Sequence, residues 1–204
     1  MRHILSSAAC LLFAISTYGQ SASPLPEPCR LKVAQAPAVR GVKLGMTIED
    51  LFPLFPGTSD SVPIRNMLAA AEGYPKFGDT TLGLSPSNYP GKERFAGINS
   101  YMLRLFDHRI VGLTVLYDRF PTGARWNNTD DLIQRFSDSL HLPGPKDWPQ
   151  DPTNPRKTLK CDGFEVIVTG GDEAVISFYA QGWEGMKRER LAAFEAQKRR
   201  EFTP

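Results

Sequence analysis

Alternation of apolar and polar residues is strongest over residues 98–118, INSYMLRLFDHRIVGLTVLYD. Two alternating runs flank the polar pair Asp107-His108. Such runs, separated by a short polar turn, are typical of two half-buried strands and predict a β-hairpin. One hairpin face then carries only apolar side chains, those of Leu103, Leu105, Leu113, Val115 and Tyr117.

The opposite hairpin face is unusually apolar for a solvent-facing surface. Besides Arg104 and Thr114 it carries Met102, Phe106 and Leu116. We expect the second helix-meander unit or the C-terminal helix to cover this face. If it is exposed instead, a contiguous apolar patch there would mark an interaction site.

Helical periods precede the hairpin. In GVKLGMTIEDLFPLF, residues 41–55, Gly45 allows a tight turn and Thr47 can cap a helix, with Asp50 at the capping-box position. Pro53 predicts that this helix is short or kinked. A second helix is predicted within residues 61–75, and the Gly-, Pro- and Ser-rich stretch 80–97 predicts a loop.

The order of elements then recurs. Residues 129–140 predict an amphipathic helix that ends before Pro143-Gly144, and residues 157–180 predict three strands joined by Asp162-Gly163 and Gly170-Gly171 turns. The expected fold class is therefore α+β, with short helices on an antiparallel β-meander. The predicted domain, 39–181, holds two helix-meander units, about 39–120 and 121–181, followed by a basic C-terminal helix, 182–204.

Leu44-Gly45-Met46-Thr47, followed by Glu49 and Leu51, resembles the Gly-Met-Thr signature of the small outer-membrane lipoproteins of the barrel-assembly machinery. A similar helix-and-strand unit occurs, duplicated, in β-lactamase-inhibitor protein. The resemblance implies helices packed on one face of an antiparallel meander, and a role in binding other proteins. Otherwise the chain is similar to uncharacterised exported bacterial proteins, and no functional residue is carried over from either family.

The first residues predict export. Arg2 and His3 precede an apolar run and a small-residue cleavage site near Ala22, the layout of a signal peptide, 1–22. The run is shorter than the roughly 20 residues that a membrane-spanning helix needs. We expect a periplasmic or secreted protein with no transmembrane segment after cleavage, beginning with an extended proline-rich arm, 23–38.

After removal of the signal peptide, which contains Cys10, the remaining thiols are Cys29 and Cys161. In an oxidising compartment such a pair is interpreted as a disulfide that pins the arm to the last sheet. The alternative is two unrelated buried thiols.

Charge gives little guidance to a partner. The formal net charge is +2, so the composition gives no reason to expect nucleic-acid binding, and none is predicted. The C-terminal KRERLAAFEAQKRREF is basic, and two interpretations stay open. The helix packs on the sheet through Leu191 and Phe194 with i,i+4 pairs such as Glu195–Arg199, or it lies on anionic lipid at the membrane surface or on a partner.

Candidate catalytic chemistry is sparse. His108 lies in the hairpin turn and His141 at the end of a helix, where an imidazolium complements the helix dipole. Two distant histidines supply no four-ligand zinc set, and Asp130, Asp131 and Asp138 are explained by their helix, so neither a metal nor another cofactor is predicted.

These observations favour an exported non-catalytic binding or scaffold protein of the bacterial cell envelope, with an envelope or secreted protein as its partner. The candidate binding residues are Arg104 on the outward sheet face and Trp126 and Trp148 in predicted loops. A loop tryptophan is either a binding anchor or a plug at the end of a core. The alternative function is a secreted hydrolase that uses His108 or His141 in an unrecognised active site.

Overall fold

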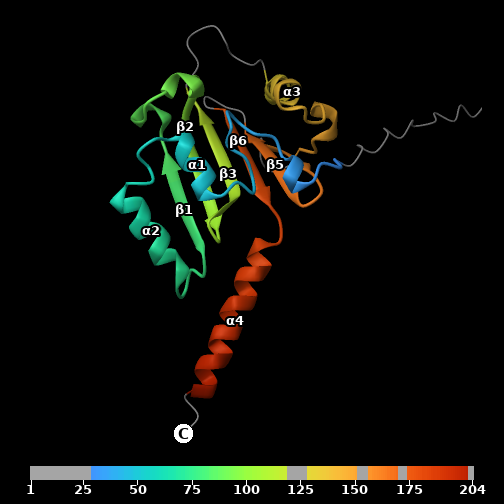
Figure 1. Ribbon diagram of the computed structural model, residues 1–204. Coiled ribbons are helices and arrows are strands. Elements are labelled where there is room, and N and C mark those ends of the chain that lie inside the picture. Colours follow the sequence, from blue (N-terminus) through green and yellow to red (C-terminus); the bar gives the residue numbers. More distant parts are fainter. Residues whose placement is uncertain (1–28, 119–127, 151–155, 170–173, 202–204) are drawn as a thin grey trace, which may run out of the picture.

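A computed structural model describes residues 29–118, 128–150, 156–169 and 174–201. Their strands form one six-stranded antiparallel sheet in the order β1-β2-β3-β6-β5-β4 (Figure 1). The strands are β1 (Asp79–Leu84), β2 (Ile98–Phe106), β3 (Arg109–Tyr117), β4 (Arg156–Lys160), β5 (Phe164–Thr169) and β6 (Val175–Ala180). The helices are α1 (Ile48–Leu51), α2 (Val62–Glu72), α3 (Thr129–Leu140) and α4 (Trp183–Glu201).

The predicted α+β class is confirmed. Each half of the chain contributes a three-stranded meander, and the two meanders join in one sheet because β3 pairs with β6. The hairpin is the β2–β3 pair, whose turn residues Asp107 and His108 have φ angles of 48° and 62°. Both therefore adopt the left-handed conformation that the tight two-residue turn needs. That the two halves are copies of one unit stays a prediction.

The first helix begins as its sequence predicts. The hydroxyl of Thr47 accepts a hydrogen bond from the Asp50 amide at 3.2 Å and donates one to the Asp50 carboxylate at 2.9 Å. After Leu51 the chain tightens into a 3-10 turn, Phe52–Leu54, which contains Pro53. Gly45, with φ of 76°, lets its amide reach the Ile110 carbonyl at 2.8 Å, which anchors the start of the helix to β3.

The predicted loop 80–97 is wrong in its first part. Residues Asp79–Leu84 form β1, an edge strand that pairs with β2 along its whole length. Thr80, Leu82 and Leu84 point into the core, while Thr81 and Gly83 are exposed. The composition of this segment favours a turn, whereas its short alternation of inward and outward side chains favours a strand. The strand forms because the inward residues bury apolar area against α2.

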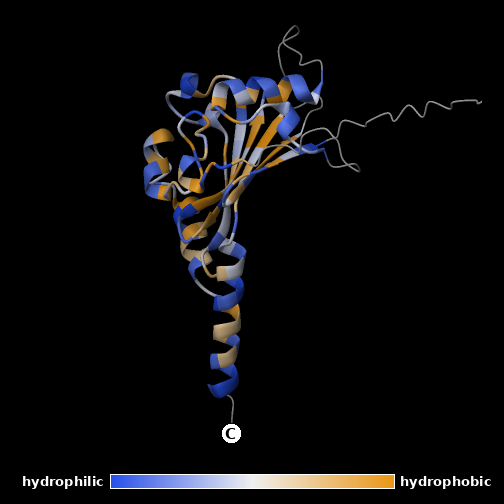
Figure 2. Cartoon of the chain, turned by 90° about the vertical axis from the view of Figure 1, so that its right-hand side faces the viewer, coloured by the Kyte–Doolittle hydropathy of each residue, from blue (hydrophilic) through white to orange (hydrophobic). Residues whose placement is uncertain are grey.

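The core lies between the sheet and the helices α1, α2 and α3. Its fully buried members come from both halves, among them Phe55, Tyr101, Leu103, Phe164 and Phe178. Figure 2 shows the hydrophobic strands in the interior and α4 projecting beyond the rest of the molecule. No helix among the described residues is long and apolar enough to cross a membrane.

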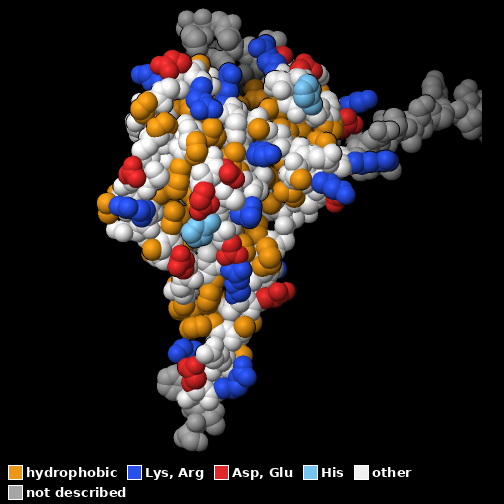
Figure 3. Space-filling model, viewed as in Figure 1, with side chains coloured by type: hydrophobic (Ala, Val, Ile, Leu, Met, Phe, Trp, Pro, Cys, Tyr) orange, Lys and Arg blue, Asp and Glu red, His pale blue; other side chains and the backbone are white. Residues whose placement is uncertain are grey.

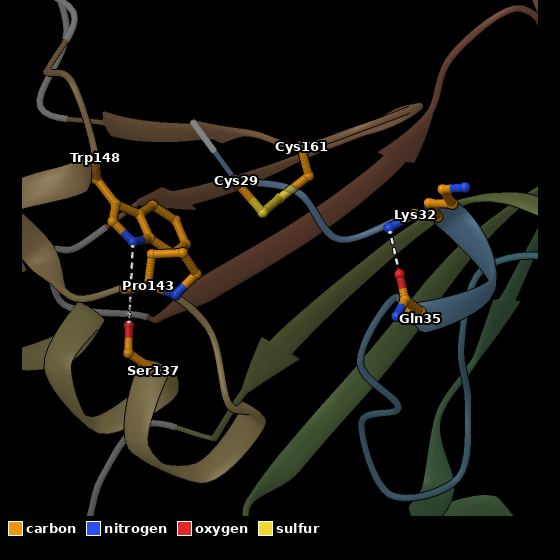
Figure 4. The surroundings of a disulfide bond; sticks show 7 residues. All are labelled: Cys29, Lys32, Gln35, Ser137, Pro143, Trp148 and Cys161. Carbon is orange, nitrogen blue, oxygen red and sulfur yellow. Dashed lines mark hydrogen bonds between the residues drawn. A yellow bond between two sulfur atoms is a disulfide. The ribbon is translucent and has the colours of Figure 1, made fainter. Parts of the chain in front are cut away.

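Cys29 and Cys161 form a disulfide, with their Cα atoms 4.5 Å apart (Figure 4). Beside it, the Asp162 amide donates to the Leu31 carbonyl at 3.0 Å. The described part of the arm is thereby held at the turn between β4 and β5, which is the role predicted for the bridge. The proposed signal peptide and the beginning of the arm lie outside the described residues.

Candidate functional site

The sheet has one face without helices above most of its area. On this open face the strands present Met102 and Arg104 of β2, Thr114 of β3, Ile167 of β5 and Tyr179 of β6. Met102 is 51% exposed, so the face is accessible to solvent. The expectation that the second unit or the C-terminal helix covers this face is wrong for all but one end.

The covered end of the face lies against the first residues of α4. The ring of Trp183 packs against Phe106 at 5.8 Å between centroids, and both side chains are buried. From there α4 runs away from the sheet (Figure 1). It covers one end of the face because the chain leaves β6 at Ala180 and the next turn, at Gly182, directs the helix outward.

Charged pairs fasten α4 along its first half. Arg190 donates to both carboxylate oxygens of Asp107 at 2.6 Å, and Lys187 donates to Asp79 at 2.6 Å. Farther along, Phe194 stacks on Tyr74 at 5.0 Å. Figure 3 shows hydrophobic side chains gathered where α4 meets the rest of the molecule. Phe194 therefore packs on Tyr74 and Phe77, in the segment after α2, and not on the sheet that the packing interpretation named.

The last turn of α4 is exposed. Lys198 pairs with Glu201 at 3.0 Å, and Arg199 lies 3.9 Å from Glu195, the predicted i,i+4 partner. Contact of this basic end with lipid stays a prediction.

Arg104 of the open face is held in place by Asp79 and Trp183. Its guanidinium donates twice to Asp79, at 2.9 Å each, and its central carbon lies 4.3 Å from the centre of the Trp183 ring. The hydrogen bond from Arg104 holds the pKa of Asp79 below its usual value, and the Asp79 carboxylate raises the pKa of Arg104. Arg104 is therefore held over the Trp183 ring and is still half-exposed.

A shallow notch of about 380 Å³ lies beside this stack, and Arg104, Glu165, Tyr179 and Trp183 contribute to its walls. In the middle of the face, Thr114 hydrogen-bonds to Ser177 at 3.0 Å and to Tyr179 at 3.3 Å. The face thus offers aromatic, methionine and arginine side chains around a fixed polar centre.

The predictions for the two loop tryptophans differ in how the structure bears on them. Trp126 lies outside the described residues. Trp148 is 2% exposed, and its indole nitrogen donates to the Pro143 carbonyl, which also accepts from Ser137. Figure 4 shows the Trp148 side chain beside Ser137 and Pro143. The structure therefore places Trp148 in the core, as a plug beneath α3, and its side chain is not available as a surface anchor.

The two histidines lie in different surroundings. His141 is exposed at the C-terminal end of α3, in a left-handed conformation with φ of 56°. His108 is 42% exposed and lies 3.8 Å from a carboxylate oxygen of Glu49 and of Glu72, beside a cavity of about 200 Å³ that Thr80 and Arg190 help to line. Among the described residues, no hydroxyl or thiol hydrogen-bonds to either imidazole.

The three aspartates of α3 have partners within the domain. Asp130 pairs with Lys157, Asp131 with Arg135, and Asp138 accepts from Gln134. In the described part of the chain no three His, Cys, Asp or Glu residues gather as a metal-binding group.

Comparison of the chain with protein-family models, with curated proteins and with solved structures gave no match.

Proposed function

We propose that this chain is an exported, non-catalytic binding protein of the bacterial cell envelope, and that it holds another folded protein against the open face of its sheet. The observation that carries the proposal is the group formed by Met102, Arg104, Tyr179 and Trp183 on that face. Aromatic residues, methionine and arginine are the types enriched where proteins bind one another, and tryptophan, tyrosine and arginine dominate binding energy.

The chemistry of the face favours a protein over a small ligand. Apart from the notch beside Trp183, the surface is the flat, pleated side of a sheet, and small ligands require concave sites. Arg104 already has its charge matched by Asp79, so it offers a rigid, planar surface more than an unpaired charge. We expect a partner that inserts an apolar side chain into the notch and hydrogen-bonds to Tyr179 or Thr114.

Export is supported by the N-terminal sequence pattern and by the Cys29–Cys161 bridge. Disulfides persist in oxidising compartments such as the periplasm and are rare in the cytosol. Both features fit a protein that meets its partner outside the cytoplasm.

Site-specific photocrosslinking in intact cells tests the proposal. A photoreactive residue at Met102 probes the open face, and the same residue at Asn66, exposed on α2, is the matched control. We expect Met102 to capture one defined protein and Asn66 to capture none. Substitution of Arg104 by Ala should then reduce this capture. Absence of any specific adduct at Met102, or the same adduct at Asn66, would contradict the assignment of the face.

A secreted hydrolase is the second candidate, and the position of His108 between Glu49 and Glu72 is the observation that favours it. A general base needs a nucleophile or water within hydrogen-bond reach. Screening the purified protein against ester, amide and glycoside substrates, with the His108→Ala variant as control, separates the two functions. An activity that is lost in this variant would replace the binding proposal.

A further inference from the structure

A second cavity lies on the helix-covered side of the sheet, away from the open face. It has a volume of about 520 Å³, is partly open to solvent, and is lined by the arm before Val42, the start of β2, the end of β3 and helix α3. Its apolar walls include Val39, Ile98, Leu132 and Phe136, all of them buried in the core. The volume is within the roughly 300–1,000 Å³ typical of pockets for small ligands.

The charged side chains of the lining all carry the same sign. Arg40 and Arg135 both contribute to the wall, and no acidic residue does. Arg40 makes no ion pair with any described residue. The Arg135 guanidinium lies 3.5 Å and 3.4 Å from the two carboxylate oxygens of Asp131, at the long end of a hydrogen bond, and Asp131 is outside the lining.

Tyr117 adds a neutral hydrogen-bond donor to the lining of the cavity. Burial raises the pKa of the Tyr117 hydroxyl to about 12, so the group keeps its proton at neutral pH. The Tyr117 ring packs on Phe136 at 5.4 Å between centroids, which fixes its position in the wall. The cavity therefore combines apolar surface, two guanidinium groups and one phenol.

We propose that this cavity binds a small amphiphilic acid, with its apolar body on the walls formed by Ile98 and Phe136 and its anionic head between Arg40 and Arg135. A guanidinium binds a carboxylate through two parallel charge-assisted hydrogen bonds, and the Tyr117 hydroxyl can donate a further one. A cationic ligand would be repelled by both arginines. An inorganic anion would match the charge but would leave the apolar walls in contact with water.

Arg40 is placed for this role by its backbone. Its φ of 53° and that of Gly41, 95°, put two consecutive residues in the left-handed region, which turns the chain sharply beside the cavity. Asparagine adopts the left-handed conformation more readily than most residues, so Arg40→Asn removes the charge and retains the turn.

Isothermal titration calorimetry of the purified disulfide-bonded protein with decanoate tests the proposal. Decanol and decyltrimethylammonium, which have the same chain with a neutral or a cationic head, are the matched ligands. We expect decanoate to bind with a dissociation constant below about 1 mM and either control ligand to bind at least roughly tenfold more weakly, since charge-assisted hydrogen bonds are lost.

Three variants locate the site. Arg40→Asn and Arg135→Gln should each weaken decanoate binding roughly tenfold, and Arg65→Gln, on exposed α2, should leave it unchanged. Ser139→Leu, which extends a side chain of α3 into the cavity, should weaken decanoate and decanol alike. Failure of decanoate to bind at about 1 mM, equal binding of the three head groups, or unchanged affinity in an Arg40→Asn, Arg135→Gln double variant would each overturn the proposal.

Discussion

Replacement of Asp79 by Asn is the sharpest test of how α4 is held. The Asp79 carboxylate, at the start of β1, accepts hydrogen bonds from Arg104 of β2 and from Lys187 of α4. One side chain thus joins two strands and the C-terminal helix. Asparagine has the same shape but carries no charge, and its amide NH₂ would face cationic donors.

The size of the effect follows from the hydrogen bonds and their exposure. A hydrogen bond to a charged group contributes about 1.5–3 kcal/mol when it is well shielded. The Asp79 side chain is only 10% exposed, but those of Arg104 and Lys187 are 45% and 31% exposed, so water screens part of the interaction. We expect the Asp79→Asn variant to lose about 1–2 kcal/mol of unfolding free energy.

The pH dependence has a defined sign. Chiefly through its hydrogen bond from Arg104, Asp79 has a folded-state pKa below its ordinary 3.8. A carboxyl with a depressed folded pKa stabilises the protein above its unfolded pKa, and this contribution disappears as the pH falls through the folded value. The difference between wild type and Asp79→Asn should therefore be constant from about pH 7 to pH 5 and shrink below about pH 4.

Urea unfolding at several pH values measures this difference. Asp60→Asn is the matched control, because Asp60 is exposed and has no ion pair with a described residue. It should stay within about 0.5 kcal/mol of wild type. A loss for Asp79→Asn no larger than that of the control, or a loss that persists undiminished at low pH, would refute the assignment of Asp79 as the charged link to α4.

Three further substitutions test the packing, each by denaturant unfolding. Replacing Cys29 and Cys161 by Ala should cost up to about 5 kcal/mol, since the bridge spans 132 residues, and reduced wild type should match the variant. Trp148→Ala should cost about 3–5 kcal/mol, and an effect below about 1 kcal/mol would contradict its place in the core. Gly78→Ala should cost about 1–3 kcal/mol, because φ is 94° and the new methyl group meets Asp107; Gly73→Ala, with open space around it, is its control.

Local patterns in the sequence were sufficient for the hairpin and for the first helix. Both depend on neighbours a few residues apart: Thr47 caps through Asp50, and Asp107-His108 closes β2 on β3. The two mature thiols likewise predicted the bridge. Strand β1 was missed because threonine and glycine fill its outward positions and a proline follows, so composition masked a six-residue alternation.

The open face could not be predicted, because it depends on the direction in which α4 leaves the sheet. Met186 of α4 is 50% exposed, whereas its charged neighbour Lys187 faces Asp79. Lys187 and Asp79 are far apart in sequence, and each has many alternative partners of opposite charge. The cavity beside Arg40 was missed for the same reason, since the other residues of its wall come from four separate segments, 96–98, 117, 132–140 and 174.

The link at Asp79 also connects stability with the proposed binding role. Asp79 holds the guanidinium of Arg104 over the Trp183 ring, and Arg104 and Trp183 both contribute to the wall of the notch. Without the Asp79 charge, Arg104 gains rotamer freedom that a partner would have to remove again on binding, at roughly 0.5–1.5 kcal/mol for one such side chain. The Asp79→Asn variant should therefore capture less partner through Met102 even at temperatures where it is fully folded. Its α4 lacks one of two charged attachments, while the Arg190–Asp107 pair remains as the other. Undiminished capture by a folded Asp79→Asn protein would show that the partner does not depend on the Arg104–Trp183 stack.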